Sequence, residues 1–329
     1  MIKKHRNTPL RVQILRAMKR RVHPQHPKYE DILTELGIKE AGIYGEQALD
    51  YYLKLLPDTF PYFIFHDLRL PYKDTHFQMD TLILFTNFYL ILEVKNLRGT
   101  IFFDPKNHQL IQEVEDHPAK VYLDPILQVS NQAYKLMEWF KNKSLTKLPG
   151  EKLVVLTHPK VLVKVLSSSY LIEKHVIKSP ALNQKLLPFF KKHPTTLLDK
   201  KLHNKVSRML LKDHTPISSS PIEQYDVLKA DLLTGVLCPN CSPVKTTVMK
   251  RIRGKWQCPH CYLISKDAHS EALKDYALLI SHEITMNELK WFLRLEDRHT
   301  IRRLLKDLNI TGSGHTKSHI YNLTSLLPQ

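Results

Sequence analysis

Residues 77–95 read FQMDTLILFTNFYLILEVK. Two strongly apolar runs in this stretch, 77–85 and 88–95, are separated by the polar dipeptide Thr86-Asn87. Apolar runs of strand length on either side of a short polar turn are typical of a β-hairpin. The surrounding sequence adds predicted helices at 42–56 and 124–140 and predicted strands at 101–103 and 153–157. We therefore expect an α/β fold, with a mixed β-sheet flanked by helices over residues 36–211.

Four polar side chains share one face of this predicted hairpin. A two-residue turn pairs Asp80 with Glu93 and Gln78 with Lys95, and side chains two residues apart on a strand point to the same side. Directly opposed carboxylates destabilise a sheet unless a cation neutralises them. Mg²⁺ binds one or two carboxylates, lowers the pKa of the water it holds and polarises a phosphoryl group. Lys95 could orient the attacking water or offset charge on the phosphorus. The alternative is that Glu93 and Lys95 form an ordinary structural salt bridge.

Short motifs in the first half of the chain follow one another in a specific order: Gly45-Glu46, Gln78-Met79-Asp80, Glu93-Val94-Lys95-Asn96 with Gly99, and Pro125 followed by Gln128. In this order they resemble the nuclease-related domain family, or NERD, over about residues 40–160. That family looks like a branch of the PD-(D/E)xK nuclease superfamily, whose core is a mixed β-sheet flanked by helices. Met79 departs from the superfamily pattern, because the name of the superfamily has proline at this position.

The resemblance implies a role for each matching residue. Asp80 and Glu93 would be ligands of Mg²⁺ or Mn²⁺, with the carbonyl of Val94 as a third ligand. Lys95 would be the catalytic lysine. The resemblance further implies that Glu46 holds the metal directly or through water, and that Gln128 positions the site or the DNA backbone.

The four cysteines of the chain lie close together as C-x2-C-x16-C-x2-C: Cys238, Cys241, Cys258 and Cys261. Two CxxC pairs at this spacing predict a zinc ribbon, in which four thiolates complete a closed tetrahedral site. A closed site leaves no open position for substrate, so the predicted Zn²⁺ is structural. A redox dithiol is the alternative for a single CxxC pair.

The segment between the cysteine pairs is basic, with Lys250, Arg251, Arg253 and Lys255 next to Trp256. Cations beside an aromatic ring are suited to phosphate contact and base stacking. The alternative is a zinc ribbon that serves packing or protein contact.

The C-terminal stretch predicts three helices, at 270–281, 285–295 and 297–308, followed by a glycine-rich loop at 311–315 and a strand at 320–323. The third helix has an apolar stripe, and its other positions are basic: Arg298, Arg302, Arg303 and Lys306. This order looks like a winged helix-turn-helix whose third helix enters a DNA groove. A structural or dimerising helical bundle is the alternative.

The charge of the chain is strongly positive and unevenly distributed. It has 49 Lys and Arg against 32 Asp and Glu, a net charge of +17. Residues 1–28 and 236–266 hold many cations and no acids, which indicates contact with a polyanion or, for the N-terminus, a solvated basic arm. We expect no membrane span, because no apolar run approaches ~18 residues, and no secretory signal, and hence a cytoplasmic protein.

These features predict five regions: a basic segment (1–35), a NERD nuclease-like domain (36–211), a linker (212–231), the zinc ribbon (232–266) and a winged-helix-like domain (267–329). The predicted function is metal-dependent hydrolysis of phosphodiester bonds, with DNA as substrate. One alternative is a DNA-binding protein without catalytic activity. A second is an adaptor whose zinc ribbon or tail binds a protein partner.

Overall fold

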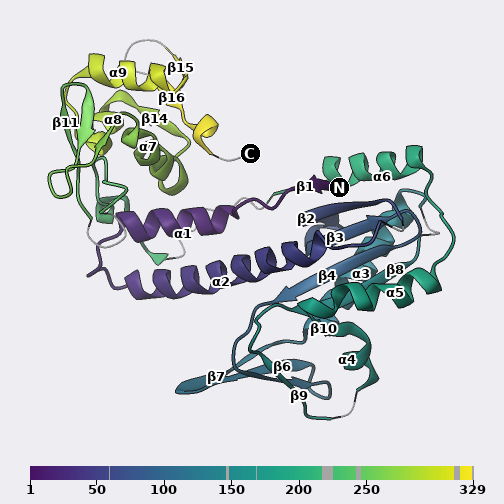
Figure 1. The fold of residues 1–329 in the computed structure, drawn as a ribbon. Helices are drawn as coiled ribbons and strands as arrows, with labels where there is room; N and C mark the ends of the chain where they lie inside the picture. The colour runs from purple at the N-terminus through teal and green to yellow at the C-terminus, as the bar shows by residue number, and fades with distance from the viewer. Residues whose placement is uncertain are drawn as a thin grey trace. The chain divides into compact units, whose positions relative to one another are not determined.

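The computed structural model describes residues 1–58, 60–145, 148–167, 169–216, 225–241, 246–314 and 319–327. The chain forms two compact units (Figure 1). Unit 1 comprises Met1–Thr8 and Glu40–Ile217, and unit 2 comprises Pro9–Lys39 and Ser218–Gln329. The expected mixed α/β architecture is confirmed, and each unit is described below by itself.

The centre of unit 1 is a six-stranded sheet with the order β1-β2-β3-β4-β8-β10. Its strands are β1 (Ile2–Lys4), β2 (Tyr62–Tyr72), β3 (Thr75–Phe85), β4 (Tyr89–Lys95), β8 (Gly150–Leu156) and β10 (Val176–Lys178). β2, β3 and β4 are antiparallel neighbours, whereas β8 runs parallel to β4 and β10. The predicted hairpin register is confirmed from Leu84 and Tyr89 to Thr81 and Leu92. The pairing ends there, so the predicted pairs of Asp80 with Glu93 and of Gln78 with Lys95 are not formed. The Phe85 N–H donates to the Phe88 carbonyl at 3.0 Å across the Thr86-Asn87 turn.

Helices cover both faces of this sheet. α3 (Pro125–Asn142), α4 (Tyr170–His175) and α6 (Lys200–Lys212) contribute to one apolar core, and α2 (Tyr29–Leu53) and α5 (Leu182–Lys192) contribute to the other. α3 starts where the sequence predicts, because the Asp124 side chain accepts from the Ile126 N–H at 2.8 Å and Pro125 opens the first turn. The helix predicted from residue 42 begins earlier, at Tyr29.

A buried carboxylate of the sheet forms hydrogen bonds with the C-terminal end of α5. Glu151 of β8 is 5% exposed. Lys192 Nζ donates to Glu151 Oε1 at 2.7 Å, and His193 Nε2 lies 2.8 Å from the same oxygen.

A second sheet of unit 1 has the order β7-β6-β5-β9. It contains β5 (Thr100–Asp104), β6 (Gln109–Val114), β7 (His117–Leu123) and β9 (Leu162–Val165). Ile101, Phe103 and Leu110 of this sheet are buried in the core that α3 also contributes to. The strand predicted at 101–103 is therefore confirmed and lies in this second sheet.

Unit 2 combines helices with two small sheets. Its helices are α1 (Leu10–Arg21), the first part of α2, α7 (Ala268–Leu279), α8 (Met286–Leu293) and α9 (Arg298–Asp307). One sheet contains β11 (Lys250–Ile252), β12 (Lys255–Gln257) and β13 (Ile264–Ser265). The other has the order β14-β16-β15, formed by Glu283–Thr285, Ile320–Asn322 and Gly312–Ser313. α8 begins with a capping box, in which the side chains of Thr285 and Glu288 each accept from the backbone N–H of the other residue.

Two features of unit 2 differ from the predicted division of the chain. The cysteine segment and the C-terminal helices share one core, in which Cys238, Cys258 and Trp256 pack with Leu289 and Phe292. α1, which belongs to the predicted basic segment, packs against α7 in the same unit. The reason is that the apolar face of α1 is buried against α7, which lies about 250 residues later in the sequence. Residues 217–224 of the predicted linker lie outside the described residues.

No helix in the described part of the chain has both the length and the apolar character that crossing a membrane requires.

Candidate active site and cysteine cluster

Asp80 lies where strands β3 and β4 separate. The regular pairing of the two strands ends at Thr81 and Leu92. Beyond that pair the Val94 N–H donates to Asp80 Oδ2 at 2.8 Å, so a side chain takes the place of a strand partner. On the other side of β3, Asp67 of β2 has a φ of 50°. The half-buried Asp80 carboxylate therefore lies at a break in the sheet.

Glu93 and Lys95 join β4 to helix α3. Glu93 is 2% exposed, and Lys95 Nζ donates to its Oε1 at 2.7 Å. The same ammonium donates to Gln128 Oε1 at 3.0 Å. The other Glu93 oxygen accepts from Gln132 Nε2 at 2.8 Å. The structure thus brings together Glu93, Lys95 and Gln128. The sequence analysis missed Gln132, although its spacing of four residues from Gln128 places both on one helix face.

Glu46 on α2 has a partner that the sequence did not reveal. Arg6, which follows β1, donates to the Glu46 carboxylate and, at 3.3 Å, to the Glu46 carbonyl. The same guanidinium lies 3.3 Å from Asp50 Oδ1 and 3.0 Å from His66 Nδ1. The helix lies so close to the end of β4 here that a Cβ added to Gly45 would be only 2.2 Å from Asn96 Cβ. Gly45 therefore permits the approach that positions Glu46.

The carboxylates of this region repel one another. Burial, followed by the negative charges of Glu93 and Glu46, raises the pKa of Asp80 well above its usual range. Burial and the charges of Asp67 and Glu93 raise the pKa of Glu46 to about 7, against the opposing effect of Arg6. A local excess of negative charge of this kind favours a bound cation.

The donor set fits a hard divalent cation of the kind that takes one or two carboxylates and keeps several waters. Asp80 and Glu93 present carboxylate oxygens on neighbouring strands. Their oxygens and those of Glu46 do not form a three-ligand cluster within 4.8 Å among the described residues. The salt bridge between Glu93 and Lys95, which the sequence left as the structural alternative, is also present.

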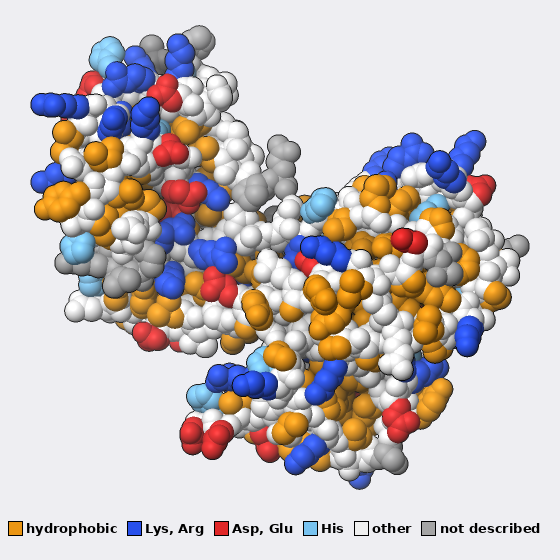
Figure 2. Space-filling model, viewed as in Figure 1, with side chains coloured by type: hydrophobic (Ala, Val, Ile, Leu, Met, Phe, Trp, Pro, Cys, Tyr) orange, Lys and Arg blue, Asp and Glu red, His pale blue; other side chains and the backbone are white. Residues whose placement is uncertain are grey.

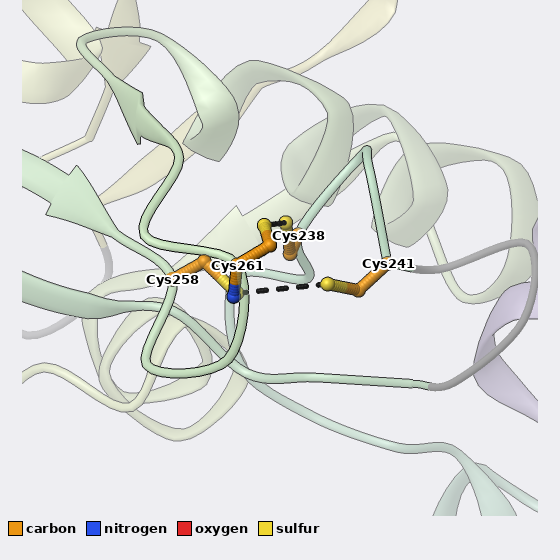
Figure 3. A group of neighbouring side chains, drawn as sticks. All are labelled: Cys238, Cys241, Cys258 and Cys261. Carbon is orange, nitrogen blue, oxygen red and sulfur yellow. Dashed lines mark hydrogen bonds between the residues drawn. The ribbon is translucent and has the colours of Figure 1, made fainter.

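The four cysteines of unit 2 converge (Figure 3). Their sulfur atoms all lie within 4.8 Å of one another. The Cys238 and Cys261 sulfurs are 3.6 Å apart, and those of Cys241 and Cys258 are 3.8 Å apart. Four ligands at about 2.3 Å from a tetrahedral Zn²⁺ would be separated by about 3.8 Å, and the cluster therefore fits a metal ion. The N–H groups of His260 and Cys261 donate to Cys258 Sγ at 3.4 Å.

The predicted basic residues of the cysteine segment differ in exposure. Lys250, Arg253 and Lys255 are exposed, whereas Arg251 is half-buried with its guanidinium 5.1 Å from the Trp256 ring centre. The predicted use of Trp256 for base stacking is wrong. Its ring is 1% exposed, and its Nε1 donates to His269 Nδ1 at 3.2 Å, because the indole is needed in the core of unit 2.

The basic face of α9 is exposed as predicted. Ile301, Leu304 and Leu305 are buried, and the cations occupy the remaining positions: Arg298, Arg302, Arg303 and Lys306. Burial and the nearby charge of Arg303 lower the pKa of Arg251. Arg251 of β11 therefore lies near Arg303 of α9, and Figure 2 shows Lys and Arg side chains gathered over these elements.

The sheet, its helices and the acidic residues at the break define a nuclease-like α/β domain. A family model described as nuclease-related domain, NERD, matches residues 41–157. This part of the chain is a nuclease-related domain, as its motifs indicate. Comparison with curated proteins and with solved structures gave no match.

Proposed function

We propose that the protein is a metal-dependent nuclease that hydrolyses phosphodiester bonds in DNA. One observation supports the proposal: within a nuclease-related domain, Asp80 accepts from the Val94 N–H where two strands separate, and the residues on either side of Val94, Glu93 and Lys95, form an ion pair. The excess of carboxylates there is what a cation-binding site requires.

Each residue of the site has a distinct task in this proposal. Asp80 and Glu93 would hold Mg²⁺ or Mn²⁺, with the Val94 carbonyl as a third ligand. When bound, such an ion activates water and polarises the phosphoryl group. The Val94 N–H fixes the orientation of the Asp80 carboxylate, and Gln132 fixes that of Glu93.

Lys95 supplies positive charge next to the reacting phosphate. Gln128 and Glu93 both accept from its ammonium and so fix its position. An ammonium held in this way can orient a water molecule or stabilise charge on phosphate oxygens. Glu46 would complete the site through water, with Arg6 setting the position of its carboxylate.

The cysteine cluster would hold a structural Zn²⁺. With four thiolates the site is closed, so its role is to hold β11–β13 on the helical part of unit 2. We infer that the order α7, β14, α8, α9, β15, β16 makes a winged helix, in which α9 would be the recognition helix and β15–β16 the wing. The tip of the predicted loop, His315, lies outside the described residues. We infer that unit 2 binds DNA through α9 and the basic strands beside it.

Cleavage of duplex DNA with Mg²⁺ or Mn²⁺ tests the proposal. Asp80→Asn and Lys95→Ala should each reduce the rate at least about 100-fold, in line with the loss of a positioned acid–base or charge-stabilising group. Two exposed residues of the same unit provide matched controls, Asp74→Asn and Lys106→Ala, and both variants should cleave like wild type. Equal traces of cleavage in all five proteins would mean contamination and would defeat the proposal.

A DNA-binding protein without catalysis is the second candidate. It is favoured by the ion pairs already present, since Lys95 neutralises Glu93 and Arg6 neutralises Glu46. In that case wild type and the Asp80 variant bind DNA equally, with affinity falling steeply as salt rises, and neither cleaves. If the protein binds no DNA at any salt concentration, the remaining candidate is an adaptor that binds a protein partner.

A further inference from the structure

Helix α6 of unit 1 has a basic face to which the proposed function assigns no role. Its sequence, KKLHNKVSRMLLK over 200–212, contains five Lys or Arg residues and no acid. Four of the cations follow at intervals of four, three and four residues, which places them on one side of the helix: Lys201, Lys205, Arg208 and Lys212. These four side chains, called the α6 stripe here, are exposed, whereas Val206 and Leu210 on the opposite side are buried.

The charge of the α6 stripe is not neutralised by neighbours. None of its four cations lies within salt-bridge distance of a carboxylate among the described residues. The acids at the two helix ends are engaged elsewhere. Asp199 accepts from the Leu202 N–H at 2.7 Å as the N-cap, and Asp213 accepts from Trp139 Nε1 at 3.0 Å. Figure 2 shows Lys and Arg side chains gathered where Figure 1 places α6.

Further positive charge lies near the same helix. His203 on α6 stacks on Phe63 of β2, with ring centres 4.0 Å apart, and Lys3 Nζ lies 4.3 Å from the centre of that Phe63 ring. Burial lowers the pKa of His203, and the charges of Lys3 and the N-terminus lower it further. Lys3 of β1 and the helix α6 therefore contact the same aromatic ring.

We propose that the α6 stripe binds the backbone phosphates of duplex DNA. The stripe spans twelve residues, 201–212, and its ends lie about 16 Å apart along the helix, long enough to contact several successive phosphates. Lysine and arginine contacts to phosphate position a duplex without reading its sequence. The proposal goes beyond the proposed function, because it gives the nuclease-related unit a DNA contact of its own and does not depend on hydrolysis.

A membrane surface is the other polyanion that a basic helix can meet. Helices that lie on membranes insert a free apolar face between the lipids. The apolar face of α6 is already buried in the core of unit 1, where Val206 and Leu210 pack with residues of β2 and α3. The geometry therefore favours nucleic acid.

Fluorescence anisotropy of a short labelled duplex, titrated in EDTA at several salt concentrations, tests the proposal. The full chain is compared with a variant in which all four residues of the stripe are replaced by Ala. A matched control replaces four exposed lysines of the second sheet of unit 1 and its turns: Lys106, Lys120, Lys160 and Lys164. Both variants have the same net charge. Because EDTA prevents cleavage, the result is independent of whether the carboxylate site is active.

The stripe variant should bind at least about tenfold more weakly, and its salt dependence, d log K/d log[salt], should become shallower by about three to four, at about 0.9 for each phosphate that the variant no longer neutralises. The control should change much less. A charge-reversal pair, Lys205→Glu with Arg208→Glu, repeats the test with fewer substitutions, and circular dichroism checks that each variant folds. Equal affinity and slope in stripe variant and wild type would overturn the proposal. So would unchanged DNA binding together with abolished binding to phosphatidylserine vesicles.

Discussion

Replacing Asp275 by Ala should strongly destabilise unit 2, because the residue neutralises a buried guanidinium. The side chains of Arg21 and Asp275 are 1% and 2% exposed, and Arg21 Nε donates to Asp275 Oδ2 at 2.8 Å. Breaking a buried ion pair from one side typically costs about 3–5 kcal/mol. In the variant, Arg21 Nη1 would still donate to the carbonyls of Leu233 and Gly235, which lie at 3.0 and 2.6 Å. We therefore expect the lower end of that range.

The assay is thermal unfolding followed by circular dichroism. For a unit of about 140 residues, a loss of about 3 kcal/mol corresponds to a fall of roughly 10 °C in the melting temperature. Glu271→Ala on the same helix is the matched control. Glu271 is an exposed partner of Arg20 at 3.9 Å, so its removal should cost less than about 1 kcal/mol.

A double variant separates the ion pair from the packing around it. Arg21→Met with Asp275→Leu removes both charges and should recover most of the stability, since apolar pairs replace buried ion pairs at little cost. The reasoning is refuted if Asp275→Ala has the same melting temperature as wild type. It is also refuted if the double variant is less stable than Asp275→Ala.

Three further predictions concern packing, pH and metal. Gly45→Ala should lower the free energy of unfolding of unit 1 by about 1–3 kcal/mol in urea titrations, because its Cβ would lie 2.2 Å from Asn96 Cβ. Gly42→Ala, where a Cβ meets nothing within 4 Å, should instead stabilise the helix by up to about 1 kcal/mol. Burial raises the pKa of Glu151, but Lys192 at the end of α5 and His193 directly after it lower it by more, so the net pKa is depressed. The Glu151 carboxylate should therefore stabilise the protein above pH ~4.5, and this contribution should be lost as the pH falls below that value. In Glu151→Gln the melting temperature should depend less on pH in this range. Cys258→Ser should release the bound metal, measured with a chromophoric chelator, and unfold unit 2, because structural zinc contributes about 10–16 kcal/mol. Retained melting behaviour without metal would contradict this last expectation.

The hairpin and the strand residues of the site could be predicted from the sequence, because local rules determine them. A two-residue turn fixes which residues pair, and alternation fixes which share a face. The pairing of Thr81 with Leu92 follows from the Thr86-Asn87 turn alone. The helix that carries Gln128 is equally predictable, because Asp124-Pro125 marks its start.

Contacts between distant segments could not be predicted in this way. Arg6 lies 40 residues from Glu46 in the sequence, and nothing in a basic N-terminal stretch distinguishes it from its neighbours. Arg21 similarly resembles part of a solvated arm until Asp275, 254 residues away, is placed beside it. Composition gives the charge of a segment, whereas only the tertiary fold shows which charges are neutralised.

Calorimetric titration of Mn²⁺ into the zinc-loaded protein tests the central claim most directly, because it measures the proposed carboxylate site without requiring turnover. We expect one Mn²⁺ per chain in wild type and in Asp74→Asn, and no binding at this site in Asp80→Asn or Glu93→Gln. Unchanged Mn²⁺ stoichiometry and affinity in both of the latter variants would contradict the claim that these two acids hold one ion.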